Sequence, residues 1–173
     1  MLLITAQIIG CVAVGLYLLS YQLKKRVHIV FVTFISNLLY VLQYLLLGAF
    51  AGAVMDVLST IASFLAVKKN TIQFKKYSNL VLIALIVFTT VAGMSIAIIK
   101  GSWIELLPIG GAVFQIISLW CNKEQTLRKF CLCSAPFWLV YNLISKAYGA
   151  AIGSVFAIVS IIVSLVRYRK KSA

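Results

Sequence analysis

Few side chains in this sequence could do chemistry, and the most unusual of them is Asp56. Of the three acidic residues it is the only one that lies inside a long apolar stretch. Ser59, Thr60 and Ser63 follow it at helical spacings and therefore share its face of a helix. A carboxylate at the centre of a membrane helix costs about 2.5–3.5 kcal/mol on insertion scales, which favours a functional role. The alternative is a protonated acid that is hydrogen-bonded to Ser59, Thr60 or a neighbouring tyrosine.

Two stripes of aromatic and amide side chains accompany this carboxyl group. The stripes are Asn37, Tyr40 and Tyr44 in the first half of the chain, and Trp138, Tyr141, Asn142 and Ser145 in the second. Polar side chains inside a membrane usually face the interior of a helix bundle, so both stripes predict the lining of a cavity. At a rise of 1.5 Å per residue, Tyr40 and Asp56 lie about 10 Å and about 9 Å from the turn between their helices, and are level. The amides Asn37, Gln43 and Asn142 could equally mediate helix packing.

The sequence offers no set of residues for catalysis or for metal binding. One membrane carboxylate without a histidine partner makes neither a hydrolytic dyad nor a metal site, and the single histidine, His28, lies in a basic segment. The cysteines match no zinc spacing and are expected to be small buried hydrophobes; they are Cys11, Cys121, Cys131 and Cys133. There is no phosphate-binding glycine loop. We therefore expect a protein that is not an enzyme and that holds no metal or cofactor.

The composition places these residues in a chain that is embedded in lipid. Of 173 residues, 63% are apolar and 11% are charged, and the mean hydropathy is +1.08. Soluble domains carry about 45–50% apolar and about 25% charged residues. The net charge of +13 could suggest nucleic-acid binding. However, the basic residues form short clusters between apolar stretches, as beside membrane helices, so we expect a lipid bilayer as the partner and no nucleic acid.

Seven apolar stretches approach the roughly 20 residues that are needed to cross a hydrocarbon core of about 30 Å. They run over residues 3–22, 29–47, 50–67, 78–99, 103–121, 130–147 and 148–166. The first has no basic leading region and is expected to be a spanning helix, not a signal peptide. Aromatic residues at span ends are interpreted as interfacial anchors; they are Tyr21, Trp103 and Tyr168.

The charges predict the orientation of these spans. With the N-terminus outside and the C-terminus in the cytoplasm, fourteen of the sixteen basic residues face the cytoplasm, which agrees with the positive-inside rule. They are Lys24, Lys25, Arg26, Lys68, Lys69, Lys75, Lys76, Lys123, Arg128, Lys129, Arg167, Arg169, Lys170 and Lys171. Only Lys100 and Lys146 remain outside.

A weak internal repeat relates the first three spans to the last three. A shift of 98 residues superposes them without an insertion, and it pairs Tyr40 with Trp138 and Asp56 with Ser154. Two three-helix units in series would face opposite ways across the membrane, and one extra crossing makes them parallel. We therefore expect an all-α integral membrane protein with seven transmembrane helices, arranged as two parallel three-helix bundles joined by a linker helix. The expected boundaries are 1–70, 71–101 and 102–173.

Several segments resemble the bacterial inner-membrane YgjV family. They are Glu105-Leu106-Leu107-Pro108-Ile109-Gly110, then Thr126-Leu127-Arg128-Lys129, and Trp138, Tyr141 and Asn142 followed by Gly149 and Gly153. That family is grouped with the SWEET and PQ-loop transporters, so the resemblance implies the same 3+1+3 arrangement and a bacterial inner membrane. The sequence lacks the proline–glutamine pair of PQ-loop proteins. If paired prolines act as hinges in that superfamily, Pro108 and Pro136 would do so in the second unit, with Gly10 and Leu38 in their places in the first.

The resemblance also implies a site and a function. In SWEET-like transporters an aromatic residue on the second helix and a polar residue on the third helix of each unit hold the substrate. By resemblance these are Tyr40, Asp56, Trp138 and Ser154. We expect a secondary transporter or facilitator of a small polar solute that works by alternating access, and Asp56 suggests a cationic solute or proton coupling. The alternative is a receptor or assembly protein on the same fold that does not transport. The oligomeric state stays open.

Overall fold

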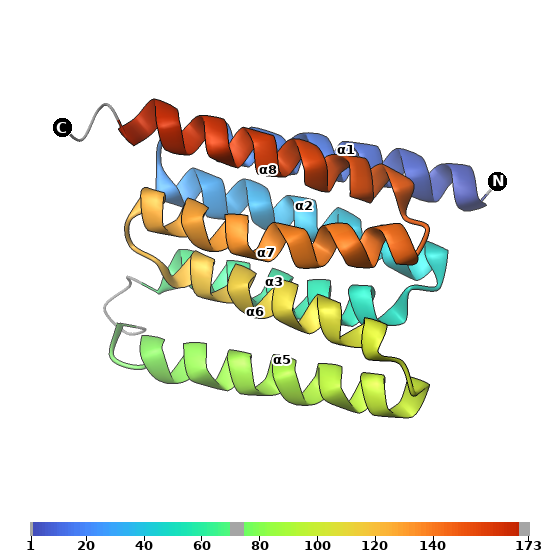
Figure 1. Cartoon of the computed structure of the whole chain (residues 1–173). Coiled ribbons are helices and arrows are strands. Elements are labelled where there is room, and N and C mark those ends of the chain that lie inside the picture. Colours follow the sequence, from blue (N-terminus) through green and yellow to red (C-terminus); the bar gives the residue numbers. More distant parts are fainter. Residues whose placement is uncertain (1, 70–74, 170–173) are drawn as a thin grey trace.

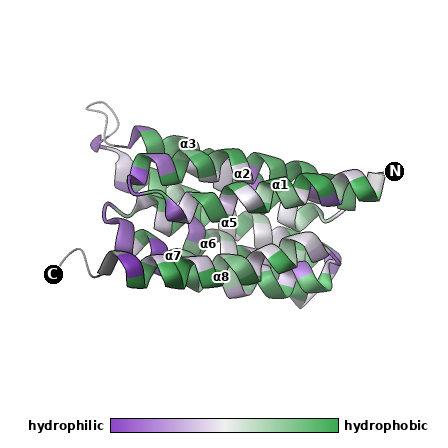
Figure 2. Ribbon diagram, turned by 90° about the horizontal axis from the view of Figure 1, so that it is seen from above, coloured by the Kyte–Doolittle hydropathy of each residue, from purple (hydrophilic) through white to green (hydrophobic). Residues whose placement is uncertain are grey.

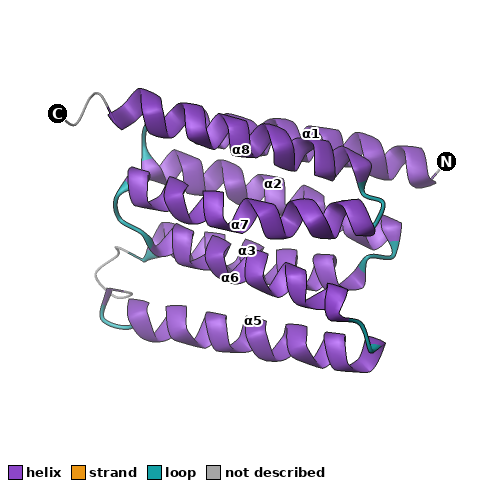
Figure 3. Ribbon diagram, viewed as in Figure 1, coloured by secondary structure: helices purple, strands orange, loops and turns teal. Residues whose placement is uncertain are grey.

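The computed structural model describes residues 2–69 and 75–169. Within these residues all regular structure is helical, which confirms the all-α prediction (Figure 3). The elements are α1 (Leu2–Gln22), α2 (Arg26–Leu47), α3 (Phe50–Lys68), α5 (Ser78–Lys100), the short 3-10 helix η1 (Trp103–Leu106), α6 (Leu107–Trp120), α7 (Glu124–Ile144) and α8 (Tyr148–Arg169).

In the described part of the chain, six helical segments are long and apolar enough to cross a membrane. They are α1, α2, α3, α5, α8 and the continuous segment Trp103–Trp120, which combines η1 with α6. The seven predicted spans therefore reduce to six on this criterion. The exception is α7, which has 21 residues but carries Glu124, Arg128 and Lys129 in its first two turns. The expected span 130–147 is also wrong at its end, because residues 145–147 form the turn into α8.

The helices form two layers of three, and a seventh lies against one side (Figures 1 and 2). In one layer α2 packs between α1 and α3, and in the other α7 packs between α6 and α8. Contacts of α1 with α8 and of α3 with α6 close the two layers into a ring, and α5 packs outside it against α3 and α6. Successive helices run in opposite directions, so α1, α3, α6 and α8 point the same way (Figure 1).

Two tight turns, from α2 to α3 and from α7 to α8, have the same backbone form. Gly48 has φ 68° and Lys146 has φ 58°, and the two positions are 98 residues apart. In each turn the next backbone N–H returns to a carbonyl of the preceding helix, at 3.0 Å for Ala49 and 2.9 Å for Ala147. A positive φ is free of steric cost for glycine and uncommon for other residues, so the second turn holds Lys146 in a strained conformation.

Basic side chains gather at one end of the bundle, where hydrophilic residues dominate the ribbon (Figure 2). This end, called the basic end below, is where α1, α3, α6 and α8 finish. It carries Lys24, Lys25, Arg26, Lys68, Lys69, Lys75, Lys76, Lys123, Arg128, Lys129 and Arg167. Lys170 and Lys171, which were predicted for the same end, lie outside the described residues. The opposite end, called the hairpin end, contains both tight turns, together with Lys100.

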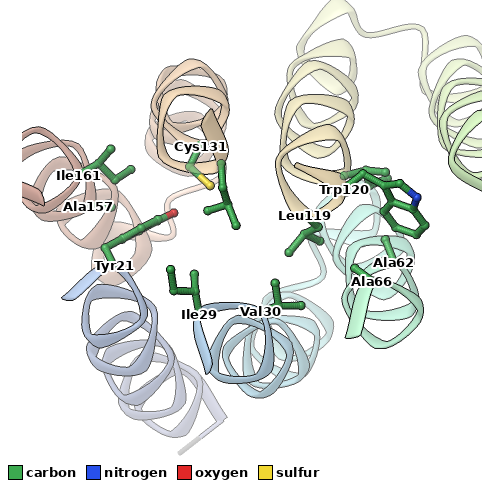
Figure 4. Packing of buried hydrophobic residues seen from close by; sticks show 12 residues of the cluster. Tyr21, Ile29, Val30, Ala62, Ala66, Leu119, Trp120, Cys131, Ala157 and Ile161 are labelled. Carbon is green, nitrogen blue, oxygen red and sulfur yellow. The ribbon is translucent and has the colours of Figure 1, made fainter. Parts of the chain in front are cut away.

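Buried side chains form two clusters, one toward each end of the bundle, and both also contact α5. The basic-end cluster includes Tyr21, Ile29, Leu119, Cys131 and Ile161, and all six ring helices contribute to it (Figure 4). The hairpin-end cluster includes Tyr44, Met55, Leu58, Trp138 and Tyr141. Many of the remaining buried positions are alanines, and small residues allow the close helix approach on which association in lipid depends.

The three expected interfacial anchors behave differently from one another. Trp103 is 70% exposed, as an anchor should be. Tyr21 is only 1% exposed and belongs to the basic-end cluster, so its interpretation as an anchor is wrong. It lies at the end of α1 but on the face that is turned toward α7 and α8. The side chain of Tyr168 lies outside the described residues.

Candidate functional site

A small cavity lies within the ring. Its volume is about 40 Å³. A cavity of this size has room for a few water molecules. The lining residues come from all six ring helices and are Tyr17, Asn37, Tyr40, Tyr44, Asp56, Gln115, Ala135, Trp138, Asn142, Ser154 and Ala157. Ten of these eleven form five pairs separated by 98 residues, so each layer contributes equivalent positions.

Eight residues are predicted from the sequence to bind substrate, namely those of the two stripes except Ser145, together with Asp56 and Ser154. Seven of them line this cavity. The eighth, Tyr141, does not, because its hydroxyl accepts a hydrogen bond from the backbone N–H of Gly52 at 3.1 Å. Gly52 lies in the first turn of α3, where backbone N–H groups lack partners within the helix. A Cβ at Gly52 would come within 2.9 Å of the Tyr141 ring, so this contact requires glycine. Tyr141 thus ties α7 to the start of α3.

The carboxyl group of Asp56 is buried and faces the cavity without a hydrogen-bond donor. The residue is 4% exposed, and no donor within residues 2–69 and 75–169 reaches its carboxyl oxygens. The hydroxyl of Thr60 donates instead to the main-chain carbonyl of Asp56 at 2.7 Å, and that of Ser63 donates to Ser59 at 2.8 Å. Hydroxyl groups in helices commonly bond the carbonyl four residues earlier. The hydroxyl groups of Thr60 and Ser63 therefore do not bond the carboxyl group of Asp56 among the described residues, and a protonated acid at this position stays a prediction.

Side-chain amides at the cavity connect the two layers. The hydroxyl of Tyr44 donates to Asn142 Oδ1 at 2.5 Å, and Asn142 Nδ2 donates to Ser154 Oγ at 3.3 Å. Gln115 Nε2 donates to Asn37 Oδ1 at 3.1 Å. Tyr44 and Asn142 are 98 residues apart, so equivalent positions of the two layers meet each other directly.

Three aromatic rings at the cavity are stacked in a row. The ring of Tyr44 lies 6.3 Å from that of Tyr40, with planes at 25°, and 6.2 Å from that of Trp138, with planes at 19°. Because Tyr44 stacks on both partners, a flat solute can lie between Tyr40 and Trp138 only after Tyr44 has moved. Tyr17 contacts the Tyr40 ring edge-on at 6.3 Å. The indole N–H of Trp138 is buried without an acceptor among the described residues.

Reasoning from the sequence missed two polar residues of the lining. Tyr17 in α1 and Gln115 in α6 were not among the predicted residues, since neither belongs to an obvious polar stripe. The 98-residue shift pairs them with each other. A search for positions that are polar in both halves of the chain could have found them.

Arg26 bridges the two layers at the basic end. It is 8% exposed, and its guanidinium donates to the carbonyls of Cys121 at 2.8 Å and Leu119 at 2.5 Å, where α6 ends. A third bond reaches the carbonyl of Ala66 in α3 at 3.3 Å. The last carbonyls of a helix lack partners within it and carry partial negative charge, so a cation is stabilised there.

Arg128 makes the reciprocal contact from the other layer. It is 2% exposed and donates to the carbonyls of Leu23 at 3.0 Å and Tyr21 at 3.4 Å, where α1 ends. These carbonyls are 98 residues before the two that Arg26 contacts in α6. Two arginines therefore connect the layers at the basic end.

Lys69 adds a further contact at the basic end. Its ammonium donates to the carbonyl of Trp120, the last residue of α6. Lys69 follows α3, outside the spanning segments. Burial and then the charge of Arg26 lower the pKa of Lys69 from its ordinary value of 10.5 to about 8.

The three expected hinge residues occupy different settings. Pro108 lies in the first turn of α6, where a missing N–H costs nothing, whereas Pro136 lies inside α7 and removes one helical hydrogen bond beside the cavity. Gly10 packs so closely on the Gln43 side chain that any Cβ there would collide with it. Their role as hinges stays a prediction. In the described part of the chain no three His, Cys, Asp or Glu side chains come together to hold a metal ion.

The apolar helices and the buried polar cavity define a class, a polytopic α-helical membrane protein with an internal site. Comparison with known proteins is more specific. The chain belongs to the Imp-YgjV family, described as bacterial inner membrane protein, whose model matches residues 4–172. The resemblance to the YgjV family and the expected bacterial inner membrane are thereby confirmed. No curated protein and no solved structure matches the chain.

Proposed function

We propose that this protein is a secondary transporter or facilitator of a small polar solute, and that the cavity is its binding site in a closed state. The observation that carries the proposal is the position of the cavity. It is lined by equivalent positions of both layers and lies between the two clusters of buried residues. A site between two units that can move against each other is what alternating access requires. Opening toward the basic end would break the contacts between the layers at that end and leave those at the hairpin end intact. Opening toward the hairpin end would do the reverse.

The proposal includes two parallel three-helix repeats, and recurring hydrogen bonds support it. Ser36 Oγ donates to the carbonyl of Ala13 at 2.8 Å, and Ser134 Oγ donates to that of Gly111 at 2.7 Å. Donors and acceptors are both 98 residues apart. The two tight turns recur at the same spacing. Matching polar contacts at one constant shift are much harder to obtain by chance than similarity between apolar sequences.

The proposed units are residues 1–70 and 102–173, joined by a linker in 71–101 that contains α5. The position of α5 outside the ring, where its side chains are mostly exposed, fits a linker that faces lipid. In this 3+1+3 arrangement α7 is the crossing that the six apolar segments leave out. Its position between α6 and α8 and the burial of Arg128 support that assignment despite its charges. The same arrangement is implied by the resemblance to SWEET and PQ-loop transporters.

The proposed orientation follows from the distribution of charge. Eleven basic residues gather at the basic end, and the positive-inside rule assigns such an end to the cytoplasm. The N-terminus is then outside and the C-terminus inside. The cysteine-accessibility experiment below also tests this orientation, because it labels from each side separately.

Asp56 supports coupling to a positive charge, either a cationic solute or a proton. Among residues 2–69 and 75–169, no Lys, Arg or His lines the cavity, so no cation of this part of the chain neutralises the carboxylate. The other titratable side chains of the lining are Tyr17, Tyr40 and Tyr44. The arrangement supports binding and translocation, and we propose no catalytic reaction and no bound cofactor. Asp56→Asn is expected to abolish solute binding or its pH dependence.

The experiment uses one cysteine placed at Ser154, in a protein whose native cysteines are replaced by serine. Ser154 is half-buried and lines the cavity. A transporter should allow a membrane-impermeant maleimide to reach this cysteine from either side of oriented membranes, with the two rates changing in opposite directions when solute binds. A cysteine at Ser160, on the outer groove between α1 and α8, is the matched control.

Labelling of the cavity cysteine from one side alone, with or without solute, would contradict the proposal. It would favour the alternative, a receptor or assembly protein on the same fold. A screen of small metabolites for thermal stabilisation, run beside Asp56→Asn and Trp138→Ala, then identifies the solute class. A solute that stabilises the wild type and neither variant binds in the cavity.

A further inference from the structure

The chemistry of the cavity defines the solute more narrowly. We infer that the solute is a small aliphatic amine, bound as its ammonium ion by the carboxylate of Asp56 in a cavity walled by aromatic rings. This inference rests on the proposed transport function, since it names the substrate class of the same cavity. It goes beyond that function because it excludes anions and neutral solutes as the preferred cargo.

The first argument is the state of Asp56. A buried carboxylate is strongly unfavourable unless it is paired and hydrogen-bonded. Asp56 is only 4% exposed, and its carboxyl group has neither a cation nor a hydrogen-bond donor among the described residues. An alkylammonium group supplies both, because it carries one positive charge and up to three N–H donors. The unpaired carboxylate and the missing partner therefore match in charge and in hydrogen bonding.

The second argument is the composition of the wall. Four of the eleven lining residues are aromatic, namely Tyr17, Tyr40, Tyr44 and Trp138. The face of an aromatic ring attracts a cation, and rings grouped around a pocket recognise organic ammonium ions. The amide dipoles of Asn37 and Asn142 are already used in bonds between helices. An anionic solute would meet the carboxylate and find no basic side chain in the lining.

The third argument is size. A volume of about 40 Å³ holds only a few water-sized groups, which corresponds to an amine of few heavy atoms. Ethylammonium has that size. Bulky amines require the rings to separate and are expected to bind less tightly to the closed state. The cavity thus favours short primary amines over large quaternary ones.

The test measures binding of radiolabelled ethylamine to the purified full chain at pH 7, with unlabelled competitors. Ethanol and acetate serve as neutral and anionic probes of similar size, with three and four heavy atoms. Ethylammonium should compete at least about tenfold better than ethanol, and acetate should not compete, because a hydrogen bond to a charged group contributes about a tenfold to hundredfold gain in affinity. Equal competition by ethanol, or stronger competition by acetate, would overturn the inference.

Charge-matched variants locate the site. Asp56→Asn should weaken ethylammonium binding about tenfold to hundredfold. Glu105→Gln removes the same charge at the hairpin end, where Glu105 pairs with Lys100 at 2.8 Å, and should change affinity by no more than about twofold. Equal losses in both variants would contradict binding at Asp56.

A second pair of variants keeps the inference testable if Asp56→Asn does not fold. Tyr40→Phe retains the aromatic face and should bind ethylammonium nearly as well as the wild type. Tyr40→Leu removes the aromatic face and should bind about threefold to thirtyfold more weakly. Equal affinity of the two variants would overturn the role of the rings.

The outcomes separate this inference from the transport proposal. Saturable ethylammonium binding without flux into proteoliposomes would leave the amine site standing and contradict transport. Exchange of a neutral or anionic solute, with no ethylammonium binding, would leave transport standing and overturn the amine site. If exchange of such a solute also depended on pH in the wild type but not in Asp56→Asn, the carboxyl group would bind a proton instead of an amine.

Discussion

Replacement of Arg26 by glutamine should open the basic end of the cavity. The guanidinium of Arg26 donates to Leu119, Cys121 and Ala66 at 2.5, 2.8 and 3.3 Å, and so connects α2 to the end of α6 and to α3. A glutamine amide has the wrong length and too few donors to replace these bonds. In the proposed mechanism, the contacts exist in the closed state and are broken when this end opens.

The magnitude follows from the two short bonds. A hydrogen bond that involves a charged group contributes about 1.5–3 kcal/mol. Arg26 is the first residue of α2. Water can hydrogen-bond its guanidinium when this end opens and so offsets part of the lost energy, and we therefore count about 1 kcal/mol for each short bond. The loss of about 2 kcal/mol corresponds to an increase of about thirtyfold in the ratio of open to closed protein.

Cys131 is a native reporter for this change. It is 5% exposed, belongs to the basic-end cluster and lies one turn after Arg128 in α7. With the other three cysteines replaced by serine, a membrane-impermeant maleimide should label Cys131 about thirtyfold faster in Arg26→Gln, as long as the open fraction stays small. Lys129→Gln, which removes an exposed charge at the same end, is the control and should label at the wild-type rate. An unchanged rate in Arg26→Gln, or the same increase in both variants, would refute the reasoning.

Three further predictions concern packing, the contact between layers and pH. Gly111→Leu should lower the free energy of unfolding by about 1–3 kcal/mol, because a Cβ there would lie 2.7 Å from the indole nitrogen of Trp138; thermal unfolding in detergent measures the loss. In a double-mutant cycle, Tyr44→Phe and Asn142→Ala should show a coupling of about 0.6–1.7 kcal/mol, and additive effects would contradict a direct bond. Lys69 has a folded-state pKa of about 8 against 10.5 ordinarily, so the unfolded chain binds more protons between these values. Its contribution to stability should therefore grow as the pH rises through that window, and the difference in unfolding temperature between wild type and Lys69→Met should move in favour of the wild type from pH 7 to pH 10.

The sequence predicted the helices and most of the cavity because both depend on local or periodic signals. Span lengths follow from the apolar stretches, and the all-helical structure from the need to satisfy backbone groups within lipid. The pairing of Tyr40 with Trp138 and of Asp56 with Ser154 required only a constant shift of 98 residues, and all four residues line one cavity.

The features that were missed depend on partners that are distant in sequence. Arg26 and Arg128 look like ordinary basic residues beside the membrane, because their carbonyl partners lie up to 95 and 107 residues away. Tyr21 looks like an interfacial anchor for the same reason. Nothing in the sequence marks Tyr17 as a lining residue, because a single tyrosine in an apolar helix usually packs against neighbouring helices. Tertiary packing alone decides which face of each helix is turned inward.

The two layers line the cavity with equivalent positions but with different residue types. A symmetric site would bind a solute on the axis that relates the layers. Here Asp56 faces Ser154 across that axis, so the only carboxylate of the lining belongs to α3. A cation would therefore bind off the axis and closer to the first layer, whereas Ser154 and Asn142 stay hydrogen-bonded to each other, to Ala150 and to Tyr44. Pro136 introduces the same asymmetry into motion, because only α7 lacks a helical hydrogen bond near the cavity. The second layer is thus expected to bend around a solute that the first layer holds.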